Sequence, residues 1–123
     1  MRKFFGIKLF AVALILTTLA SNSFALSRIR FAPGRSSATV AGVLGAGEVT
    51  KYVLTAREYQ TMTVEVKSGN DDIRFSIADV HGLFDSYDNG WAEIETDANG
   101  NHWITLRNRG RYATRYTMTV RVR

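Results

Sequence analysis

The sequence predicts an all-β fold, a single antiparallel β-sandwich of about seven or eight short strands. Three stretches alternate apolar and polar residues with a period of two, the pattern of strands that bury one face. Glycine, asparagine and proline turn signals separate the stretches at short intervals, and no apolar pattern predicts a helix longer than two turns. Short strands spaced in this way are typical of sandwiches and barrels.

The clearest predicted strand is residues 59–67, in which Met62, Val64 and Val66 share one face. Residues 73–77 and 116–122 repeat the alternation. Weaker candidate strands are residues 27–31, 38–44, 51–55, 92–96 and 102–106. Turn signals occur at residues 33–34, 45–47, 68–70, 81–82, 88–90, 97–100 and 108–110.

The N-terminus has the composition of a secretory signal peptide, predicted to span residues 1–25. Its first eight residues carry three positive charges, residues 9–20 are apolar and uncharged, and the small residues Ser23 and Ala25 form a cleavage signal. An apolar run of this length is too short to span a bilayer core of roughly 30 Å. We therefore expect residues 26–123 to form one soluble domain with no membrane contact after cleavage.

Charge and cysteine content exclude several classes of function. Cleavage would remove Arg2, Lys3 and Lys8 from the 16 basic residues, leaving 13 against 11 acidic ones, a balance that does not indicate nucleic-acid binding. The absence of cysteine excludes disulfides, thiolate catalysis, cysteine zinc sites and a lipid-modified N-terminal cysteine. An exported domain without disulfides fits a bacterial periplasm or medium, so we expect a periplasmic or secreted bacterial protein.

The charges are unevenly distributed along the chain. Residues 71–97 carry eight acidic side chains and the single base Arg74, whereas residues 107–123 carry six arginines and no acid. Opposite charges on neighbouring strands would pair across the sheet. Alternatively, a turn containing Arg107, Arg109 and Arg111 would present guanidinium donors to carboxylates or phosphates.

The sequence gives little support for catalysis, cofactors or metal binding. No Gly-x-Ser-x-Gly motif occurs, and neither His81 nor His102 has serine and acid partners at a recognised spacing. Both histidines are interpreted as structural or exposed. Residues 85–90 resemble a calcium loop only in part, because Tyr87 interrupts the oxygen donors and an Asn-Gly turn explains them. We expect a protein that is not an enzyme and needs no cofactor or metal.

Two alternatives remain open at this point. Trp91, Trp103, Tyr87 and Phe84 would serve a carbohydrate-binding module by stacking on sugars, although at least one tryptophan is expected in the core. The acidic segment would also permit a small hydrolase that uses paired carboxylates.

Several segments form a recognisable pattern. They are residues 31–34, 36–40, 61–66, 75–77, 97–100 and 116–120, together with Gly42, Tyr52, Leu54, Ala56 and Gln60. The pattern resembles a bacterial family of periplasmic inhibitors of g-type lysozymes, with a sister group directed against i-type lysozymes. The same strands and turns are also similar to the pre-peptidase C-terminal module of secreted bacterial proteases.

The resemblance implies an inhibitor that inserts a loop into the acidic cleft of a lysozyme and so occludes it. Arg109 and Arg111 match the family's loop arginines, with Arg107 supporting them and Tyr112 packing beside them. The pre-peptidase resemblance instead implies a non-catalytic carbohydrate- or envelope-binding module. In either case an edge strand would allow the domain to form a homodimer.

The chain departs from the inhibitor pattern at several positions. Its arginine loop is shorter than usual. Gly47 stands where a tyrosine is frequent, Tyr59 replaces a glycine, and His102 stands where a tyrosine is common.

Overall fold

The computed structural model describes residues 24–87 and 89–123. The predicted signal peptide, residues 1–25, lies outside the described residues except for its last two, which begin the first strand. In the described part, no helix has the length and apolar character needed to cross a membrane.

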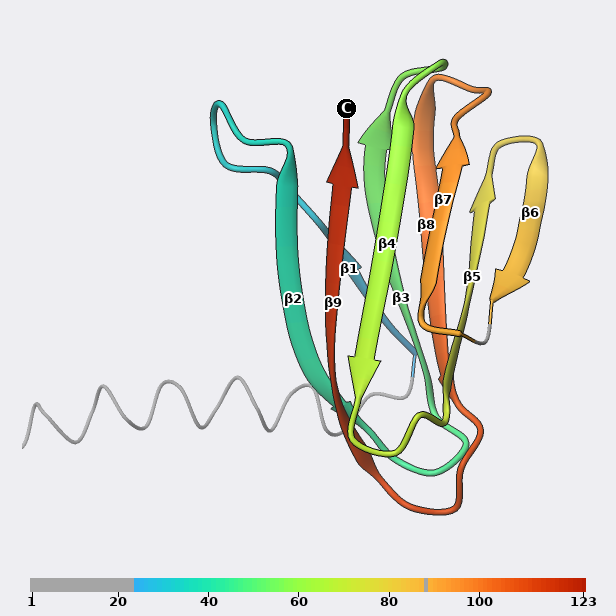
Figure 1. Ribbon diagram of the computed structural model, residues 1–123. Helices are drawn as coiled ribbons and strands as arrows, with labels where there is room; N and C mark the ends of the chain where they lie inside the picture. Colours follow the sequence, from blue (N-terminus) through green and yellow to red (C-terminus); the bar gives the residue numbers. More distant parts are fainter. Residues whose placement is uncertain (1–23, 88) are drawn as a thin grey trace, which may run out of the picture.

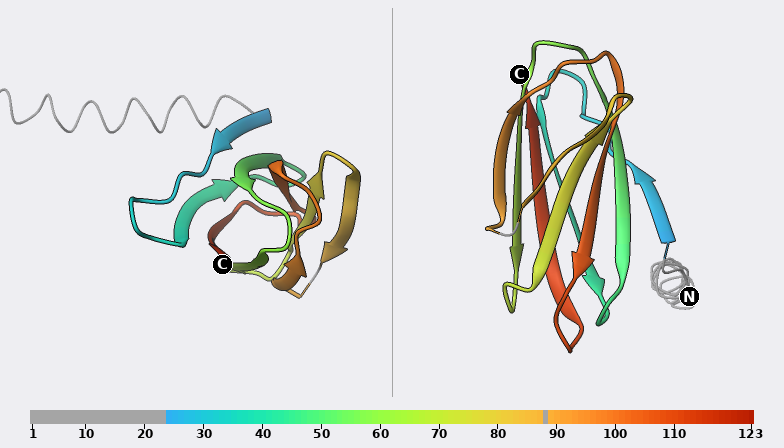
Figure 2. Two further views of the ribbon diagram at one scale, coloured as in Figure 1. Left: turned by 90° about the horizontal axis from the view of Figure 1, so that it is seen from above. Right: turned by 90° about the vertical axis from the view of Figure 1, so that its right-hand side faces the viewer.

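The described chain forms two facing β-sheets (Figure 1), which confirms the predicted β-sandwich. The strands are β1 (Phe24–Arg28), β2 (Ser37–Leu44), β3 (Val49–Ala56), β4 (Thr61–Ser68), β5 (Ile73–Asp79), β6 (Gly82–Tyr87), β7 (Trp91–Glu95), β8 (Gly100–Asn108) and β9 (Thr114–Val122). One sheet has the order β1-β3-β8-β5-β6 and the other β2-β9-β4-β7. Seen from above in Figure 2, the strands surround a common interior.

The structure differs from the sequence prediction in two strands. The described residues contain nine strands, because β6 forms between the turn signals at residues 81–82 and 88–90, where no strand was predicted. In addition, β1 pairs with β3 in parallel, with Phe24 opposite Val49, whereas the other described pairings are antiparallel. The parallel pairing follows from the route of the chain, which crosses to the second sheet as β2 before returning as β3.

The interior is made by the apolar faces that the alternation predicted. Met62, Val64 and Val66 on β4 are buried, as are the inward residues of β5 and β9. Side chains from both sheets pack into one core. The largest fully buried apolar side chains are Phe75, Leu54, Met62, Ile77, Ile104, Leu106 and Met118.

The expectation that a tryptophan lies in the core is wrong. Trp91 is exposed, and Trp103 is only half-buried because it stands between His102 and Ile104, whose side chains point inward. Since successive side chains on a strand point to opposite faces, Trp103 faces away from the core. The aromatic side chains buried in the core are instead Phe75, Tyr52 and Tyr116.

A polar contact inside the core joins the two sheets. The hydroxyl groups of Tyr52 on β3 and Tyr116 on β9 lie 2.6 Å apart in a buried hydrogen bond. Gly42 pairs with Tyr116 in the β2–β9 ladder, and a Cβ atom at Gly42 would lie 2.7 Å from the Tyr116 hydroxyl oxygen. Glycine at this position therefore leaves room for the tyrosine ring.

Candidate functional site

Three loops meet at one end of the sandwich, drawn at the bottom of Figure 1. They are residues 45–48 between β2 and β3, residues 69–72 between β4 and β5, and residues 109–113 between β8 and β9. We call residues 109–113 the arginine loop. The Gly47 amide donates to the Asn108 carbonyl over 2.9 Å, and the Arg109 amide donates to the Asp72 carbonyl over 2.9 Å. The arginine loop is thus held by backbone bonds to both neighbouring loops.

A buried side chain, Asn108, fixes the base of the arginine loop. Its Nδ2 donates to the carbonyl oxygens of Leu44 at 3.0 Å and Tyr112 at 2.8 Å. Its Oδ1 accepts the backbone N–H of Gly110 at 2.8 Å. Asn108 is fully buried, so these bonds form away from water. The sequence placed Asn108 only in a turn signal; that signal could have indicated a side chain bonding to its own backbone.

Gly110 allows the arginine loop to lie close to the β4–β5 loop. A Cβ atom at Gly110 would lie 2.8 Å from the carboxyl carbon of Asp72 and 3.0 Å from its Cβ. A larger residue here would push the two loops apart, since real Cβ atoms do not approach this closely.

The structure brings the four predicted contact residues to this end of the molecule. Arg109, Arg111 and Tyr112 are exposed on the arginine loop, with Tyr112 77% exposed. Arg107 is exposed on β8 one residue before the buried Asn108, so it points outward from the five-stranded sheet. The four side chains therefore flank the tip of the sandwich and the adjoining sheet face.

The arginines of residues 107–123 form no ion pair within the described part of the chain, so the predicted pairing of these arginines across the sheet is not observed. Lys67–Glu65 at 3.8 Å and His81–Asp97 at 3.7 Å are ion pairs of the structure, and neither involves a C-terminal arginine. The topology explains this, because acidic β7 and arginine-rich β9 lie on opposite sides of β4. Arg107 instead stands opposite Arg74 in the β5–β8 ladder, a pairing of like charges that does not stabilise a sheet.

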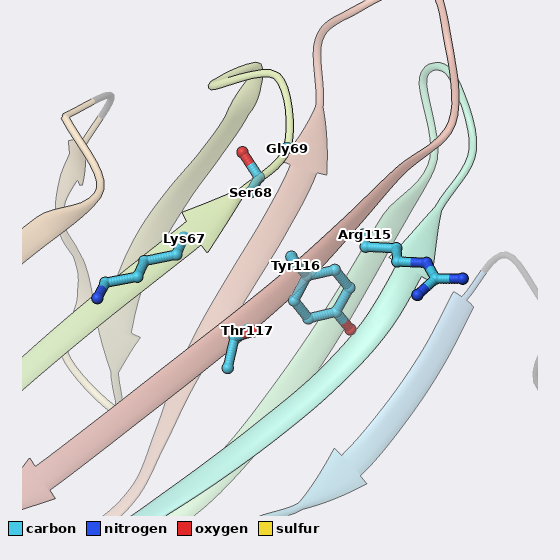
Figure 3. Close-up of a pocket in the computed structure, with 6 residues that line it drawn as sticks. All are labelled: Lys67, Ser68, Gly69, Arg115, Tyr116 and Thr117. Atoms are coloured by element: carbon cyan, nitrogen blue, oxygen red, sulfur yellow. The ribbon is translucent and has the colours of Figure 1, made fainter.

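A shallow hollow of about 250 Å³ lies at the same end of the four-stranded sheet. Figure 3 shows Lys67 and Arg115 pointing to either side of the Tyr116 ring. Ser68, Gly69 and Thr117 complete the lining. The lining residues contain no carboxylate and no histidine. Lys67 and Arg115 can offer hydrogen-bond donors to an acidic partner.

The three residues that depart from the inhibitor pattern, Gly47, Tyr59 and His102, lie at opposite ends of the sandwich. Gly47 lies in the β2–β3 loop with φ of 77°, a conformation that a tyrosine would adopt only with strain. Tyr59 does adopt it, with φ of 67°, in the β3–β4 turn at the other end of the molecule. His102 lies near the start of β8 at that end and is fully buried. Of the three substituted positions, only Gly47 lies beside the arginine loop.

A second group of ionisable side chains occupies the end opposite the arginine loop. Asp79, His81 and Asp97 place their potential ligand atoms within 4.8 Å of one another, a proximity that the sequence did not indicate. Burial raises the pKa of Asp79, but the hydrogen bond from the His81 amide, the interaction with the Asp97 carboxyl group and the attraction of the two histidines when they are protonated outweigh it and hold this pKa below its ordinary value.

Comparison with known proteins identifies the fold. No family model matches the chain, and no curated protein matches it in sequence. PliG from Aeromonas hydrophila, a periplasmic lysozyme inhibitor of g-type lysozyme, superposes with a TM-score of 0.74 at 20% identity, covering 81% of this chain and 97% of that one. PliG from Salmonella Typhimurium gives a TM-score of 0.63 at 20% identity, covering 80% and 98%.

A pre-peptidase C-terminal domain also shares the fold. The domain of Bacillus anthracis collagenase gives a TM-score of 0.60 at 12% identity, covering 78% of this chain and 94% of that one. Both predicted resemblances are therefore confirmed as likenesses of fold.

Proposed function

We propose that this chain is an exported bacterial protein inhibitor that binds a g-type or i-type lysozyme and occludes its active-site cleft. Residues 1–25 would direct export, and residues 26–123 would act in the periplasm or outside the cell. Arg109 and Arg111 are the main anchors, Arg107 supports them from β8, and Tyr112 packs beside them. The protein acts by occupying the cleft and catalyses no reaction.

The observation that carries the proposal is that the arginine loop is ordered and presents unpaired guanidinium groups to solvent. Arg109 and Arg111 are exposed, form no ion pair among the described residues, and sit on a loop whose base is fixed by Asn108. A guanidinium group forms strong bidentate hydrogen bonds with a carboxylate, and glycosidase clefts carry essential carboxyl groups. A loop that is already ordered loses little conformational entropy on binding, so more of the contact energy contributes to affinity.

The alternative of a carbohydrate- or envelope-binding module has weaker structural support. Among the residues whose side chains the structure describes, which do not include Phe84, the exposed large aromatic residues are Tyr59, Trp91 and Tyr112, and they lie on the β3–β4 turn, on β7 and on the arginine loop. A sugar-stacking platform requires aromatic side chains on one surface. Glycan binding that survives loss of the loop arginines and disappears in Trp91→Ala would support this alternative.

An inhibition panel over c-, g- and i-type lysozymes tests the proposed function. We expect the processed protein to slow lysis of cell walls by a g-type or i-type enzyme. The double variant Arg109→Ala/Arg111→Ala should bind more weakly by about 2–4 kcal/mol, roughly 30- to 1000-fold in Kd.

The matched control is Arg57→Ala/Arg121→Ala. It also removes two exposed arginines, so both double variants have the same net charge. Arg57 follows β3 and Arg121 lies near the end of β9, both away from the arginine loop. We expect this control to inhibit like the unmodified protein. Absence of inhibition of every lysozyme type at micromolar protein, or equal weakening by both double variants, would contradict the proposal.

A further inference from the structure

The end of the sandwich opposite the arginine loop carries a compact group of metal-ligating side chains. Asp79 is the last residue of β5, His81 lies in the turn that follows, and Asp97 lies just after β7. Figure 1 shows the ends of β5 and β7 at the same end of the molecule. One ligand atom from each of the three side chains lies within 4.8 Å of the other two.

Asp79 points an unsatisfied acceptor into this group. The side chain is only 6% exposed, and its Oδ1 accepts the His81 amide at 2.7 Å. Its Oδ2 is buried and has no hydrogen-bond partner. Buried polar atoms are rarely left in this state, so an unpartnered carboxylate oxygen beside an imidazole requires an explanation.

A second unsatisfied acceptor belongs to His102, the histidine next to this group. His102 is the neighbour of Trp103, which pairs with Ala78, so it lies beside Asp79 across the β5–β8 ladder. Its Nδ1 lies 3.0 Å from the Gly100 carbonyl oxygen and must donate to it. The neutral ring then carries its lone pair on Nε2, which is buried without a partner.

These observations share one physical explanation. With Asp79 ionised and His102 neutral, Asp79 Oδ2 and His102 Nε2 are both acceptors, so neither satisfies the other. A cation bound at Asp79 would satisfy the carboxylate and place a positive charge near the second lone pair. The histidine also has the arrangement common to metal-binding imidazoles, in which the other ring nitrogen bonds a backbone carbonyl.

We propose that Asp79, His81 and Asp97 form a binding site for a divalent first-row transition ion, with Zn²⁺ as the best match. One imidazole nitrogen and two carboxylate oxygens suit Zn²⁺ better than Ca²⁺ or Mg²⁺, which take oxygen ligands almost alone. His81 and Asp97 are largely exposed and already paired at 3.7 Å, so an ion can reach them from solvent.

The site would join segments that belong to different sheets. Asp79 ends a strand of the five-stranded sheet, whereas Asp97 follows a strand of the four-stranded sheet. A bound ion would therefore hold the two sheets together at the end away from the arginine loop. This inference does not depend on the lysozyme proposal.

Calorimetric titration with zinc chloride tests the site. The protein is purified from the periplasm of its host without a histidine tag and treated with EDTA, and Ca²⁺ is titrated in parallel. We expect one Zn²⁺ per chain with a dissociation constant in the micromolar range or below, and no comparable binding of Ca²⁺. The chain has two histidines, His81 and His102, so a variant of His81 separates Zn²⁺ binding through His81 from binding through His102.

The double variant His81→Gln/Asp97→Asn should raise the dissociation constant for Zn²⁺ at least about tenfold, because it removes two of the three side chains proposed to bind the ion. Both residues are exposed, and thermal unfolding without metal checks that the variant folds. Asp71→Asn/Glu93→Gln removes two exposed carboxylates elsewhere and should bind like the unmodified protein. Unchanged Zn²⁺ affinity in the first variant, binding weaker than millimolar in the unmodified protein, or preference for Ca²⁺ would overturn the inference.

Discussion

At the scale of single residues, Asn108 determines the shape of the proposed binding loop. Its amide group contacts the end of β2 and two positions of the arginine loop, and each of its polar atoms has a partner. The arginines themselves make no ion pair among the described residues that would hold the loop in place. The position of the guanidinium groups thus depends on a neutral, buried side chain that a bound partner would not touch.

Replacing Asn108 with alanine should lower the free energy of unfolding by about 2–3 kcal/mol, because the Leu44 and Tyr112 carbonyls and the Gly110 amide lose a buried partner. Urea denaturation measures the loss. Asn70→Ala is a suitable control, since exposed Asn70 makes a comparable bond to the Asp72 amide in the neighbouring loop and should cost well under about 1 kcal/mol. Equal losses in the two variants would show that Asn108 has no special role.

At the scale of elements, the β3–β4 turn is fixed by contacts with the β7–β8 connection. Thr96 is fully buried, its carbonyl accepts the Tyr59 amide at 2.7 Å, and its Oγ1 accepts the Gln60 amide at 2.8 Å. These bonds keep Tyr59 in the left-handed region although its side chain is 75% exposed and has no buried environment. Because several hydrogen bonds fix the backbone of this turn, it tolerates a tyrosine at a positive φ angle that side chains other than glycine adopt only with strain.

Tyr59→Gly should therefore raise the free energy of unfolding by about 0.5–1 kcal/mol, because glycine adopts positive φ without the steric cost that tyrosine pays, partly offset by a more flexible unfolded chain. Tyr59→Ala loses the same side chain but keeps the Cβ atom, and should give no gain. Thermal or urea unfolding of the three proteins separates the two effects. A gain in Tyr59→Ala equal to that in Tyr59→Gly would assign the effect to the exposed ring instead.

At the scale of the whole molecule, the Tyr52–Tyr116 hydrogen bond couples the two sheets through the core. Burial raises the pKa of Tyr116 above its ordinary value, and the bond with Tyr52 raises it further. Because the folded state favours the neutral hydroxyl, this group contributes full stability below its unfolded pKa of about 10, and the contribution is lost as the pH rises above that value.

Tyr116→Phe should lower the free energy of unfolding by about 1–2 kcal/mol at pH 7, because the Tyr52 hydroxyl is left buried without its partner. Above about pH 10 the unmodified protein should lose stability more steeply than the variant. Urea denaturation at pH 7 and at several alkaline pH values measures both effects. If the two proteins had the same alkaline pH dependence, Tyr116 would not be the group whose ionisation opposes folding.

The two proposed sites lie at opposite ends of the molecule. The arginine loop and Arg107 gather positive charge at one end, and Asp79, His81 and Asp97 gather carboxylates and an imidazole at the other. Variants at one end can therefore be used as controls for experiments at the other.

The sequence by itself determined the sandwich class, the inward faces of β4, β5 and β9, and the turn that carries Arg109 and Arg111, whereas Arg107, predicted in the same turn, lies on β8. These features are local, because alternation sets which face of a strand is apolar and turn residues set where the chain reverses. The tertiary structure alone decided that β1 pairs in parallel with β3, that Trp103 faces outward, and that Asn108 supports the loop. It also brought Asp79 and Asp97 together from different sheets. Such features depend on which distant segments become neighbours, and that choice is made when the two sheets bury their apolar faces against each other.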